Sequence, residues 1–371
     1  MIYCAFYLCR KNFSVLMPYL KAEQGYTSEQ LAQALFAYSL AYSGGQFAMG
    51  FLADRFGSRI VVTLGALASA AASSLTGALT PLVAVQGANG VAQSAGWPGV
   101  LKMARDWFPD RNRAVVMAWW GTHLVVGGFL GTNLAAKAAE GGWLRGAWVP
   151  GAVLAVAALV FGLLARDRMW RMPGGSGGRG RLPINGAIAA IAAMYFFVKL
   201  TRYAFLFWLP LYMTERLRYS PVQAGYASSA YELVGFLGVL LAGYASERIA
   251  GVSRYAVASA MMFVLAALVG AYPYVSAWGV WMNLAAIAAI GMFTFGPDTL
   301  MAGPGTQEAV PPEIVASAGG FVNGIGSVGQ ILSPVVVALV AGRFGWQALF
   351  GVLGFAAFLG GLALSTHWRR W

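Results

Sequence analysis

Long apolar stretches recur along the whole chain, and they limit it to one class of fold. A run of about 20 apolar residues is enough to cross the hydrocarbon core of a bilayer as a helix. The chain is 59% hydrophobic and only 10% charged, whereas soluble domains carry about 25% charged residues. The sequence therefore predicts an all-α membrane protein with twelve transmembrane helices, over residues 1–20, 28–53, 60–79, 82–103, 112–136, 145–165, 184–213, 221–246, 255–274, 277–303, 313–341 and 346–365.

The second half of the chain repeats the first half. The segment GFLADRFGSR at 50–59 returns as GYASERIAGVSR at 243–254. The segment RKNFSVLMPYL at 10–20 returns as RYAFLFWLPLY at 202–212. Two homologous halves around a site at the bilayer midplane are the plan of many secondary transporters.

The segment 166–183 separates the two halves. It is basic and rich in glycine, which is typical of a flexible linker. We therefore predict two pseudo-symmetric six-helix bundles, at 1–165 and 184–371, joined by this cytoplasmic linker. Thr27 and Ser220 occupy equivalent places in the two halves, and both are suited to cap the helix that follows.

Lysine and arginine residues are distributed unequally between the two sets of helix ends. Fifteen of the 25 lie at one set and six at the other, and an excess of this kind marks the cytoplasmic side. Both termini are then expected in the cytoplasm. Most of the net charge of +12 serves membrane topology in this interpretation, so no nucleic-acid partner is needed to explain it.

Four positive charges lie inside predicted spans, where each costs about 2.5–3.5 kcal/mol at the centre of the bilayer. They are Arg10 and Lys11 in the first span and Lys199 and Arg202 in the seventh. Arg10 and Arg202 are equivalent in the repeat, so we expect them to face each other across the pseudo-two-fold axis. Arginine binds phosphate and carboxylate groups through two parallel hydrogen bonds. The pair therefore predicts an anion clamp.

Other polar residues of the spans fit this interpretation. Tyr3, Tyr7 and Arg10 recur at helical spacing and form one stripe. Glu232 and Asp298 supply two negative charges against the four cations. The positive surplus is one that a dianionic phosphate ester can neutralise.

His123 lies in the middle of the fifth predicted span. Its side chain titrates near neutral pH, so it can bind phosphate or carry a proton. It can equally be a structural residue that donates a hydrogen bond to a backbone carbonyl.

Small residues on one helix face let neighbouring helices approach closely. Gly127 and Gly131 have the Gly-x-x-x-Gly spacing in the fifth span, and Gly320 and Gly324 have it in the eleventh. Both spans are therefore predicted to pack closely against a partner helix.

The turn between the second and third spans carries a distinctive motif. The segment GFLADRFGSR resembles the loop signature of the major facilitator superfamily, and a weaker copy follows the eighth span. At a helix end, its acidic residue can interact with arginines and a neighbouring helix N-terminus, and so latch the two halves in one state. Solvated turn charges without this role are the alternative. The residues of this gating motif are Gly50, Asp54, Arg55, Gly57, Arg59, Glu247 and Arg248.

The whole chain resembles one branch of that superfamily. The segments FYLCRKNFSVLMPYL, NGVAQSAGWPGVLKMARDWFP and FVKLTRYAFLFWLPLYM are similar to the organophosphate:phosphate antiporter family of glycerol-3-phosphate, hexose-6-phosphate and sugar-phosphate transporters. The resemblance implies obligate exchange of an organic phosphate for inorganic phosphate by a rocker-switch movement, in the bacterial inner membrane. It also implies a substrate site that contains Arg10, Arg202, His123, Tyr3, Tyr7 and Tyr42. Lys11 and Lys199 lie near the two arginines in the sequence and are further candidates for this site.

The sequence departs from the family pattern at two ion pairs. Phe207 stands where the resemblance places an aspartate that pairs with Lys11, and Gln46 stands where it places a lysine that pairs with Glu232. Because an unpaired buried charge is strongly unfavourable, Lys199 becomes a candidate partner for Glu232. The rewiring affects the identity of the organic substrate more than the preference for phosphate.

Two other functions stay open at this point. The chain can be a proton-coupled transporter of carboxylates with Glu232 and His123 as proton carriers, or a sugar-phosphate sensor that does not transport. An enzyme is not expected, because the sequence shows no nucleophile–base pair, metal cluster or phosphate-binding loop. We expect a monomer in membrane lipid, without a cofactor or metal.

Overall fold

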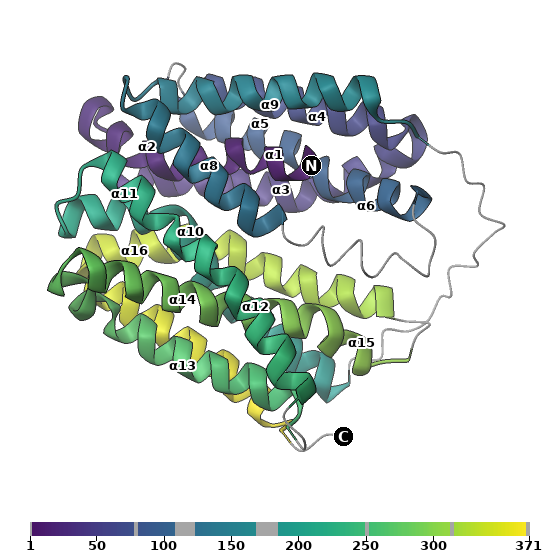
Figure 1. Ribbon diagram of the computed structural model, residues 1–371, viewed down its shortest axis with the longest axis vertical. Coiled ribbons are helices and arrows are strands. Elements are labelled where there is room, and N and C mark those ends of the chain that lie inside the picture. The colour runs from purple at the N-terminus through teal and green to yellow at the C-terminus, as the bar shows by residue number, and fades with distance from the viewer. Residues whose placement is uncertain are drawn as a thin grey trace. The chain divides into compact units, whose positions relative to one another are not determined.

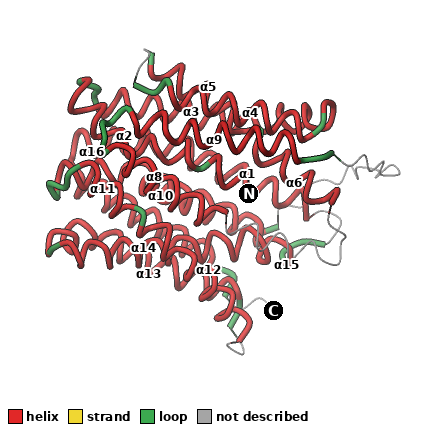
Figure 2. The backbone as a smooth tube through the Cα atoms, turned by 45° about the horizontal axis from the view of Figure 1, so that its top comes forward, coloured by secondary structure: helices red, strands yellow, loops and turns green. Residues whose placement is uncertain are grey.

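The computed structural model describes residues 2–77, 81–107, 123–167, 185–248, 252–311 and 315–368. Within these ranges the chain is almost entirely helical, with short turns between helices (Figure 2). The helices follow one another in this order (Figure 1): α1 (Ile2–Phe6), α2 (Leu8–Gln24), α3 (Ser28–Phe56), α4 (Ser58–Ser74), α5 (Leu82–Ser94), α6 (Gly96–Trp107), α8 (His123–Ala139), α9 (Arg145–Leu164), α10 (Gly186–Arg216), α11 (Pro221–Ser228), α12 (Ala230–Arg248), α13 (Arg254–Val275), η1 (Ser276–Trp278), α14 (Val280–Leu300), η2 (Met301–Gly305), α15 (Thr306–Glu308) and α16 (Val315–Ser365).

The described helices coincide with the predicted spans. α16 covers the last two spans, and Gly345 divides it because its φ of 83° and ψ of 172° are not helical. Residues 112–122 of the fifth span and most of the predicted linker lie outside the described ranges. Among the described residues, six helical stretches are long and apolar enough to cross a membrane: Arg145–Leu164, Gly186–Arg216, Pro221–Arg248, Arg254–Trp278, Val280–Glu308 and Ala318–Ser365.

Both predicted helix caps are confirmed. The Thr27 hydroxyl accepts a hydrogen bond from the backbone N–H of Gln30 at 3.2 Å, and the Gln30 side chain accepts from the Thr27 backbone N–H at 2.9 Å. Ser220 and Gln223 form the same reciprocal pair before α11, at 3.2 and 3.0 Å. Each capping box provides partners for N–H groups that the start of a helix otherwise leaves unpaired.

The chain forms two compact units. The first contains Met1–Gly174 together with Phe207–Ser229, and the second contains Gly175–Leu206 together with Ala230–Trp371. α10 therefore begins in the second unit and ends in the first.

The first unit encloses α2. α3 packs on α5, α4 packs on α5 and α9, and α2 packs on α8 and α9 (Figure 1). Every residue of α2 from Leu8 to Pro18 is buried as a result. The core between these helices consists mostly of apolar and small side chains, among them Phe6, Cys9, Val62, Ala66, Ala70, Leu154 and Ala158.

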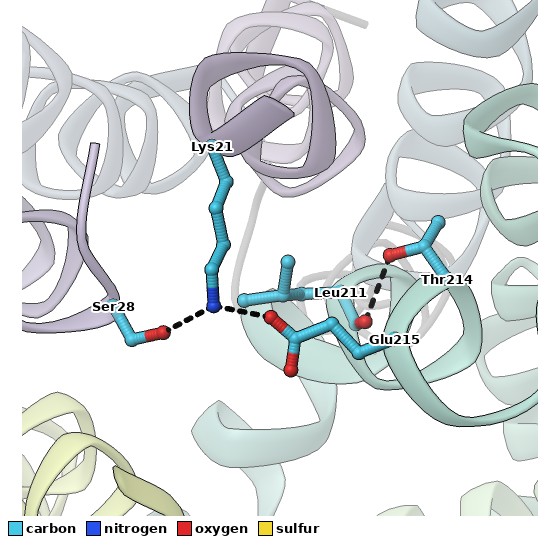
Figure 3. Close-up of polar contacts among 5 residues, drawn as sticks. All are labelled: Lys21, Ser28, Leu211, Thr214 and Glu215. Atoms are coloured by element: carbon cyan, nitrogen blue, oxygen red, sulfur yellow. Dashed lines mark hydrogen bonds and ion pairs between the residues drawn. The ribbon is translucent and has the colours of Figure 1, made fainter. Parts of the chain in front are cut away.

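An ion pair fastens the last part of α10 to the first unit. The Lys21 ammonium group at the end of α2 pairs with the Glu215 carboxylate near the end of α10 (Figure 3). The same ammonium group donates to the Ser28 hydroxyl at 2.9 Å. Beside Glu215, the Thr214 hydroxyl donates to the backbone carbonyl of Leu211 at 2.8 Å, which leaves that hydroxyl satisfied within the helix.

A second polar contact fastens α11 to α8. The Tyr226 hydroxyl donates to the Glu140 carboxylate at 2.9 Å, and Lys137 pairs with the same carboxylate at 2.6 Å. The hydrogen bonds from Lys137 and Tyr226 hold the pKa of Glu140 below its ordinary value, because they stabilise the ionised form. Glu140 is therefore ionised at neutral pH.

The second unit is built around α13, α14 and α16. α12 packs on α14, and α13 packs on both α14 and α16. Two hydroxyl groups join α10 to α16: Ser333 donates to the Leu200 carbonyl at 2.9 Å, and Thr201 donates to the Leu353 carbonyl at 3.5 Å. The π-helical turn η2 follows α14 directly.

One of the two predicted glycine patterns sets a close helix contact. A Cβ on Gly131 would lie 2.6 Å from the Tyr7 carbonyl oxygen, and one on Gly127 would lie 2.8 Å from a carbonyl oxygen of α1. The close approach predicted for the fifth span is therefore confirmed. A Cβ on Gly320 or Gly324 would meet no described atom within 4 Å, so the described residues show no close partner there.

The contact between α12 and α14 allows a test of the packing. A Cβ on Gly238 would overlap the backbone carbonyl of Met292, and one on Gly291 would overlap that of Tyr231. Gly238→Ala is therefore expected to destabilise the protein by about 1–3 kcal/mol, the usual cost of overpacking. Thermal unfolding in detergent measures the effect.

Gly243→Ala is the matched control in the same helix. A Cβ on Gly243 would meet no described atom within 4 Å. Its melting temperature is expected to equal or exceed that of the wild type, because alanine favours a helix more than glycine does. Equal losses of stability in the two variants would contradict the close contact at Gly238.

Candidate functional site

Six charged side chains are buried among the described residues, and all six were singled out from the sequence. Arg10 and Lys11 belong to the first unit, at 4% and 2% exposure. The second unit contains two cations and two acids, so its buried charges balance. Among the described residues, buried cations therefore outnumber buried acids in the first unit alone. The four buried charges of the second unit are Lys199, Arg202, Glu232 and Asp298.

Arg10 lies in a cage of tyrosines. Its guanidinium carbon is 4.6 Å from the ring centre of Tyr7, 4.7 Å from that of Tyr42 and 6.0 Å from that of Tyr3. The hydroxyl groups of Tyr3 and Tyr42 are 3.1 Å apart and share a hydrogen bond. Aromatic faces attract a cation without neutralising it. The structure thus brings together four of the residues predicted for the substrate site.

Gln93 fixes one edge of the Arg10 guanidinium. Arg10 Nε donates to Gln93 Oε1 at 2.8 Å, and the Tyr38 hydroxyl donates to the same oxygen at 3.1 Å. Gln93 Nε2 donates to the Phe6 carbonyl at 3.2 Å, which settles the orientation of the amide. Sequence reasoning missed Gln93 and Tyr38; an amide in the apolar fourth span was the available signal.

The other edge of the Arg10 guanidinium has a nitrogen that can donate further hydrogen bonds. Its Nη2 is buried and has no hydrogen-bond partner in the described part of the chain. A buried donor without a partner costs about 1–3 kcal/mol, and more when it is charged. An anion that accepts from this nitrogen therefore removes a penalty as well as supplying charge.

Phe207 gives the departure from the family pattern a physical meaning. Its ring packs edge-on against Tyr38 at 6.1 Å, and its side chain is 2% exposed. Tyr38 in turn stacks on Tyr42 at 6.0 Å. An aromatic residue thus extends the tyrosine cluster at the position where the resemblance places an aspartate.

Arg202 has a carboxylate partner in the second unit. Its Nη1 pairs with Asp298 Oδ2 at 2.5 Å, and both side chains are buried. The guanidinium carbon lies 4.6 Å from the ring centre of Phe295. Asp298 was predicted as a charge-pair residue, but its partner was not identifiable from spacing alone.

Lys199 lies beside this pair. Its ammonium group donates to Asn323 Oδ1 at 2.8 Å and lies 4.8 Å from the ring centre of Tyr195. Sequence reasoning offered Glu232 as its partner and missed Asn323. Glu232 itself is buried on α12, at 1% exposure.

Other predicted contacts involve two different units or side chains outside the described ranges. Arg10 and Arg202 belong to different units, so their facing each other remains a prediction. The side chains of His123 and Asp54 lie outside the described part of the structure. Gln46 is half-buried on α3.

The predicted gating motif forms the junction of α3 and α4. Gly57 adopts φ 89°, a conformation that glycine tolerates, and ends α3. The Asp167 carboxylate, which follows α9, accepts from the backbone N–H of Arg59 at 3.0 and 3.2 Å. Asp167 was missed from the sequence, although it supplies the negative charge that a helix start favours.

Four further residues of the motif belong to α3 and α12. Gly50 is part of α3, where a Cβ would meet only the Pro98 side chain at 3.7 Å. The guanidinium of Arg55 lies over the Phe56 ring, and that of Arg248 lies over the Tyr244 ring. Glu247 is exposed near the end of α12.

Comparison with known proteins places the chain in a family. The model of the Major Facilitator Superfamily matches residues 1–189 and 191–370. The chain belongs to this superfamily. The match extends over both halves, which agrees with the internal repeat.

Relatives with assigned functions carry the names of phosphate-ester transporters. The glycerol-3-phosphate transporter of Bacillus subtilis (strain 168) is 26% identical, over 99% of this chain and 90% of the relative. The putative glycerol-3-phosphate transporter 1 of Arabidopsis thaliana is 28% identical, over 89% and 73%. The glucose-6-phosphate exchanger SLC37A2 of Bos taurus is 27% identical, over 85% and 76%. The predicted resemblance to organophosphate:phosphate antiporters is confirmed, and these relatives are transporters rather than enzymes.

Solved structures support the fold. A bacterial homologue of the human lysosomal transporter Spinster, inward-facing and unoccupied, has a TM-score of 0.73 with this chain at 13% identity, covering 98% of this chain and 91% of its own. An occupied form of such a homologue has a TM-score of 0.72 at 17% identity. The predicted twelve-helix major facilitator fold is thereby confirmed.

The amide of Gln93 provides a test of the Arg10 site. Gln93→Glu is expected to place a carboxylate against Arg10 Nε and to neutralise the guanidinium. Binding of inorganic phosphate, the anion that the sequence predicts, should then fall at least tenfold. The protein should stay folded because the new carboxylate has Arg10 as a partner. Calorimetric titration and thermal unfolding measure the two properties.

Gln86→Glu on the same helix is the control. Gln86 is 2% exposed and donates to Thr76 Oγ1 at 3.2 Å. A carboxylate there is expected to lower stability, because burial of a charge without a cationic partner is costly. Unchanged phosphate binding in Gln93→Glu would show that Arg10 does not hold the anion.

Proposed function

We propose that this protein is a secondary active transporter that exchanges an organic phosphate ester for inorganic phosphate by alternating access. The observation that carries the proposal is the buried Arg10, whose described neighbours are tyrosines and an amide rather than an acid. A guanidinium in this setting keeps its charge and its fork of donors for an incoming anion. The names of the relatives supply the substrate class, a sugar phosphate or glycerol-3-phosphate.

The surroundings of Arg10 support exchange over one-way transport. Arg10 is buried, and its described neighbours, the tyrosine rings and the Gln93 amide, leave its charge in place. A buried charge that its neighbours do not offset is expensive inside a membrane protein. A bound phosphate dianion supplies the counter-charge, so the loaded protein crosses between its states more readily than the empty one. Each reorientation then carries a phosphate in one direction or the other.

We assign the other predicted residues to supporting roles. Lys11, His123, Lys199 and Arg202 complete the polar lining that receives the phosphate and its organic part. The residues of the gating motif hold one state of the alternating cycle. Bundles at 1–165 and 184–371, joined by the linker 166–183, are the moving parts.

The location and orientation are also proposals. The excess of lysine and arginine at one set of helix ends supports termini in the cytoplasm. The resemblance to bacterial phosphate-ester transporters supports a bacterial inner membrane. We expect a monomer to suffice, since each half of the repeat supplies one arginine.

Exchange in proteoliposomes tests the proposal. Vesicles loaded with inorganic phosphate are expected to take up labelled phosphate, glycerol-3-phosphate or glucose-6-phosphate, and empty vesicles are not. A pH gradient without internal phosphate should produce no uptake. Uptake driven by the pH gradient and indifferent to phosphate would favour a proton-coupled carboxylate transporter. Binding of a phosphate ester without any flux would favour a sensor.

Arg10→Lys removes the guanidinium group and keeps the positive charge. An ammonium group offers a point charge and cannot reproduce the planar fork. Loss of one or two charge-assisted hydrogen bonds, each worth about 1.5–3 kcal/mol, should reduce phosphate exchange by at least tenfold. The initial rate of phosphate self-exchange is the measurement.

Arg145→Lys is the control for the chemical change itself. Arg145 is exposed at the start of α9. This variant is expected to exchange phosphate at the wild-type rate. Wild-type exchange in Arg10→Lys would instead make Arg10 a structural residue.

A further inference from the structure

The two repeat-related arginines are held by different chemical groups. Arg10 Nε donates to the neutral amide of Gln93 at 2.8 Å, whereas Arg202 pairs with the carboxylate of Asp298 at 2.5 Å. An amide leaves the charge of a guanidinium in place, and a carboxylate neutralises it. The two positions are therefore unequal as anion sites.

The Asp298 carboxylate is only partly satisfied. It is 5% exposed, and its Oδ2 accepts from Arg202. Its Oδ1 is buried and accepts no hydrogen bond of ordinary geometry in the described part of the chain, although the Tyr195 side chain also interacts with the carboxylate. An ionised carboxylate offers about four acceptor sites, and buried acceptors without partners are unfavourable. Asp298 is therefore a replaceable ligand of Arg202.

Asp298 lies close to the end of its helix. α14 ends at Leu300, and the π-helical turn Met301–Gly305 follows. A π-helical turn interrupts the regular α-helical ladder, and such interruptions are frequent at functional sites. The carboxylate thus lies next to a departure from the rigid helix, where a small rearrangement can withdraw it from Arg202.

The surroundings of Arg202 favour an anion with more charge than a carboxylate. Lys199 interacts electrostatically with both Arg202 and Asp298, while its ammonium group donates to the neutral Asn323. A phosphate dianion can accept a hydrogen bond from Arg202 and at the same time interact with the positive charge of Lys199. A monocarboxylate offers Arg202 the same single negative charge and the same acceptor oxygens that Asp298 already provides.

We propose that Asp298 is an internal competitor that occupies Arg202 in the empty protein and is displaced by the phosphate of the substrate. Asp298 then determines specificity: it excludes carboxylates, which gain nothing by the exchange, and admits phosphate dianions, which bring an additional charge. This inference rests on the proposed function and names the discriminating residue of the same site.

Equilibrium binding to purified protein in detergent tests the competition. The probes are inorganic phosphate and glycerate, a carboxylate that resembles a phosphate ester in size. Asp298→Asn keeps the shape of the side chain and removes its charge. It is expected to lower the Kd for phosphate at least threefold and the Kd for glycerate at least tenfold. The preference for phosphate over glycerate then becomes smaller than in the wild type.

This increase in affinity for the two anions must depend on Arg202. In the Arg202→Gln background, Asp298→Asn is expected to produce no gain for either anion, as a double-mutant cycle would show. An unchanged or raised Kd for phosphate in Asp298→Asn overturns the proposal. A gain that persists without Arg202 overturns it as well.

Labelling of the wild-type protein keeps the test independent of any variant. A hydrophobic carbodiimide modifies protonated buried carboxyl groups, and mass spectrometry locates the adduct. Saturating phosphate is expected to increase modification of Asp298 relative to Glu232, because the displaced carboxylate leaves its cation and takes up a proton. Equal or lower modification of Asp298 in the presence of phosphate contradicts the displacement.

The outcomes separate this inference from the proposed function. If the wild-type protein neither binds nor exchanges phosphate, the proposed function fails. If it does both and Asp298→Asn binds phosphate no more tightly, only the role of Asp298 fails.

Discussion

A charge buried in a membrane protein must be compensated, and this requirement organises the structure. In the second unit, Arg202 and Lys199 are balanced by Glu232 and Asp298. In the first unit, Arg10 is surrounded by polarisable rings and an amide, which orient the guanidinium and leave its charge intact. Because α2 is buried from Leu8 to Pro18, bulk water is kept away from this charge. In the proposed function, the phosphate anion supplies the compensation that the described neighbours of Arg10 do not, and this links the packing of one helix to the proposed transport.

The parts of the site that follow local spacing could be predicted from the sequence. Tyr3, Tyr7 and Arg10 share one helix face because of the helical period, and the structure brings their side chains together. The caps at Thr27 and Ser220 also depend on residues only three positions away. The spans, the helix caps and the tyrosine stripe all depend on residues that are close together in the sequence.

The parts of the site that depend on distant segments could not be predicted in the same way. Gln93 and Asn323 are neutral amides, so a count of charged residues in the sequence does not identify them. Each nevertheless accepts a hydrogen bond from a buried cation. Asp298 was identified by its charge, but its pairing with Arg202 depends on how α14 packs on the rest of its unit. Asp167 follows a helix in a basic segment and resembles an ordinary solvated charge until the fold brings it to Arg59.

The packing of α12 on α14 also governs how the acids of the second unit can move. At Gly238 and Gly291 the two helices meet backbone to backbone, with no side chain between them to tilt or slide. We expect two helices in such close contact to shift together, so that the backbone positions of Glu232 on α12 and Asp298 on α14 keep a nearly constant spacing. Arg202 and Lys199 belong to a third helix, α10. The backbones that carry the two acids are therefore expected to move together, and a change of electrostatic partner has to come from α10, from the Asp298 side chain beside η2, or from a bound anion.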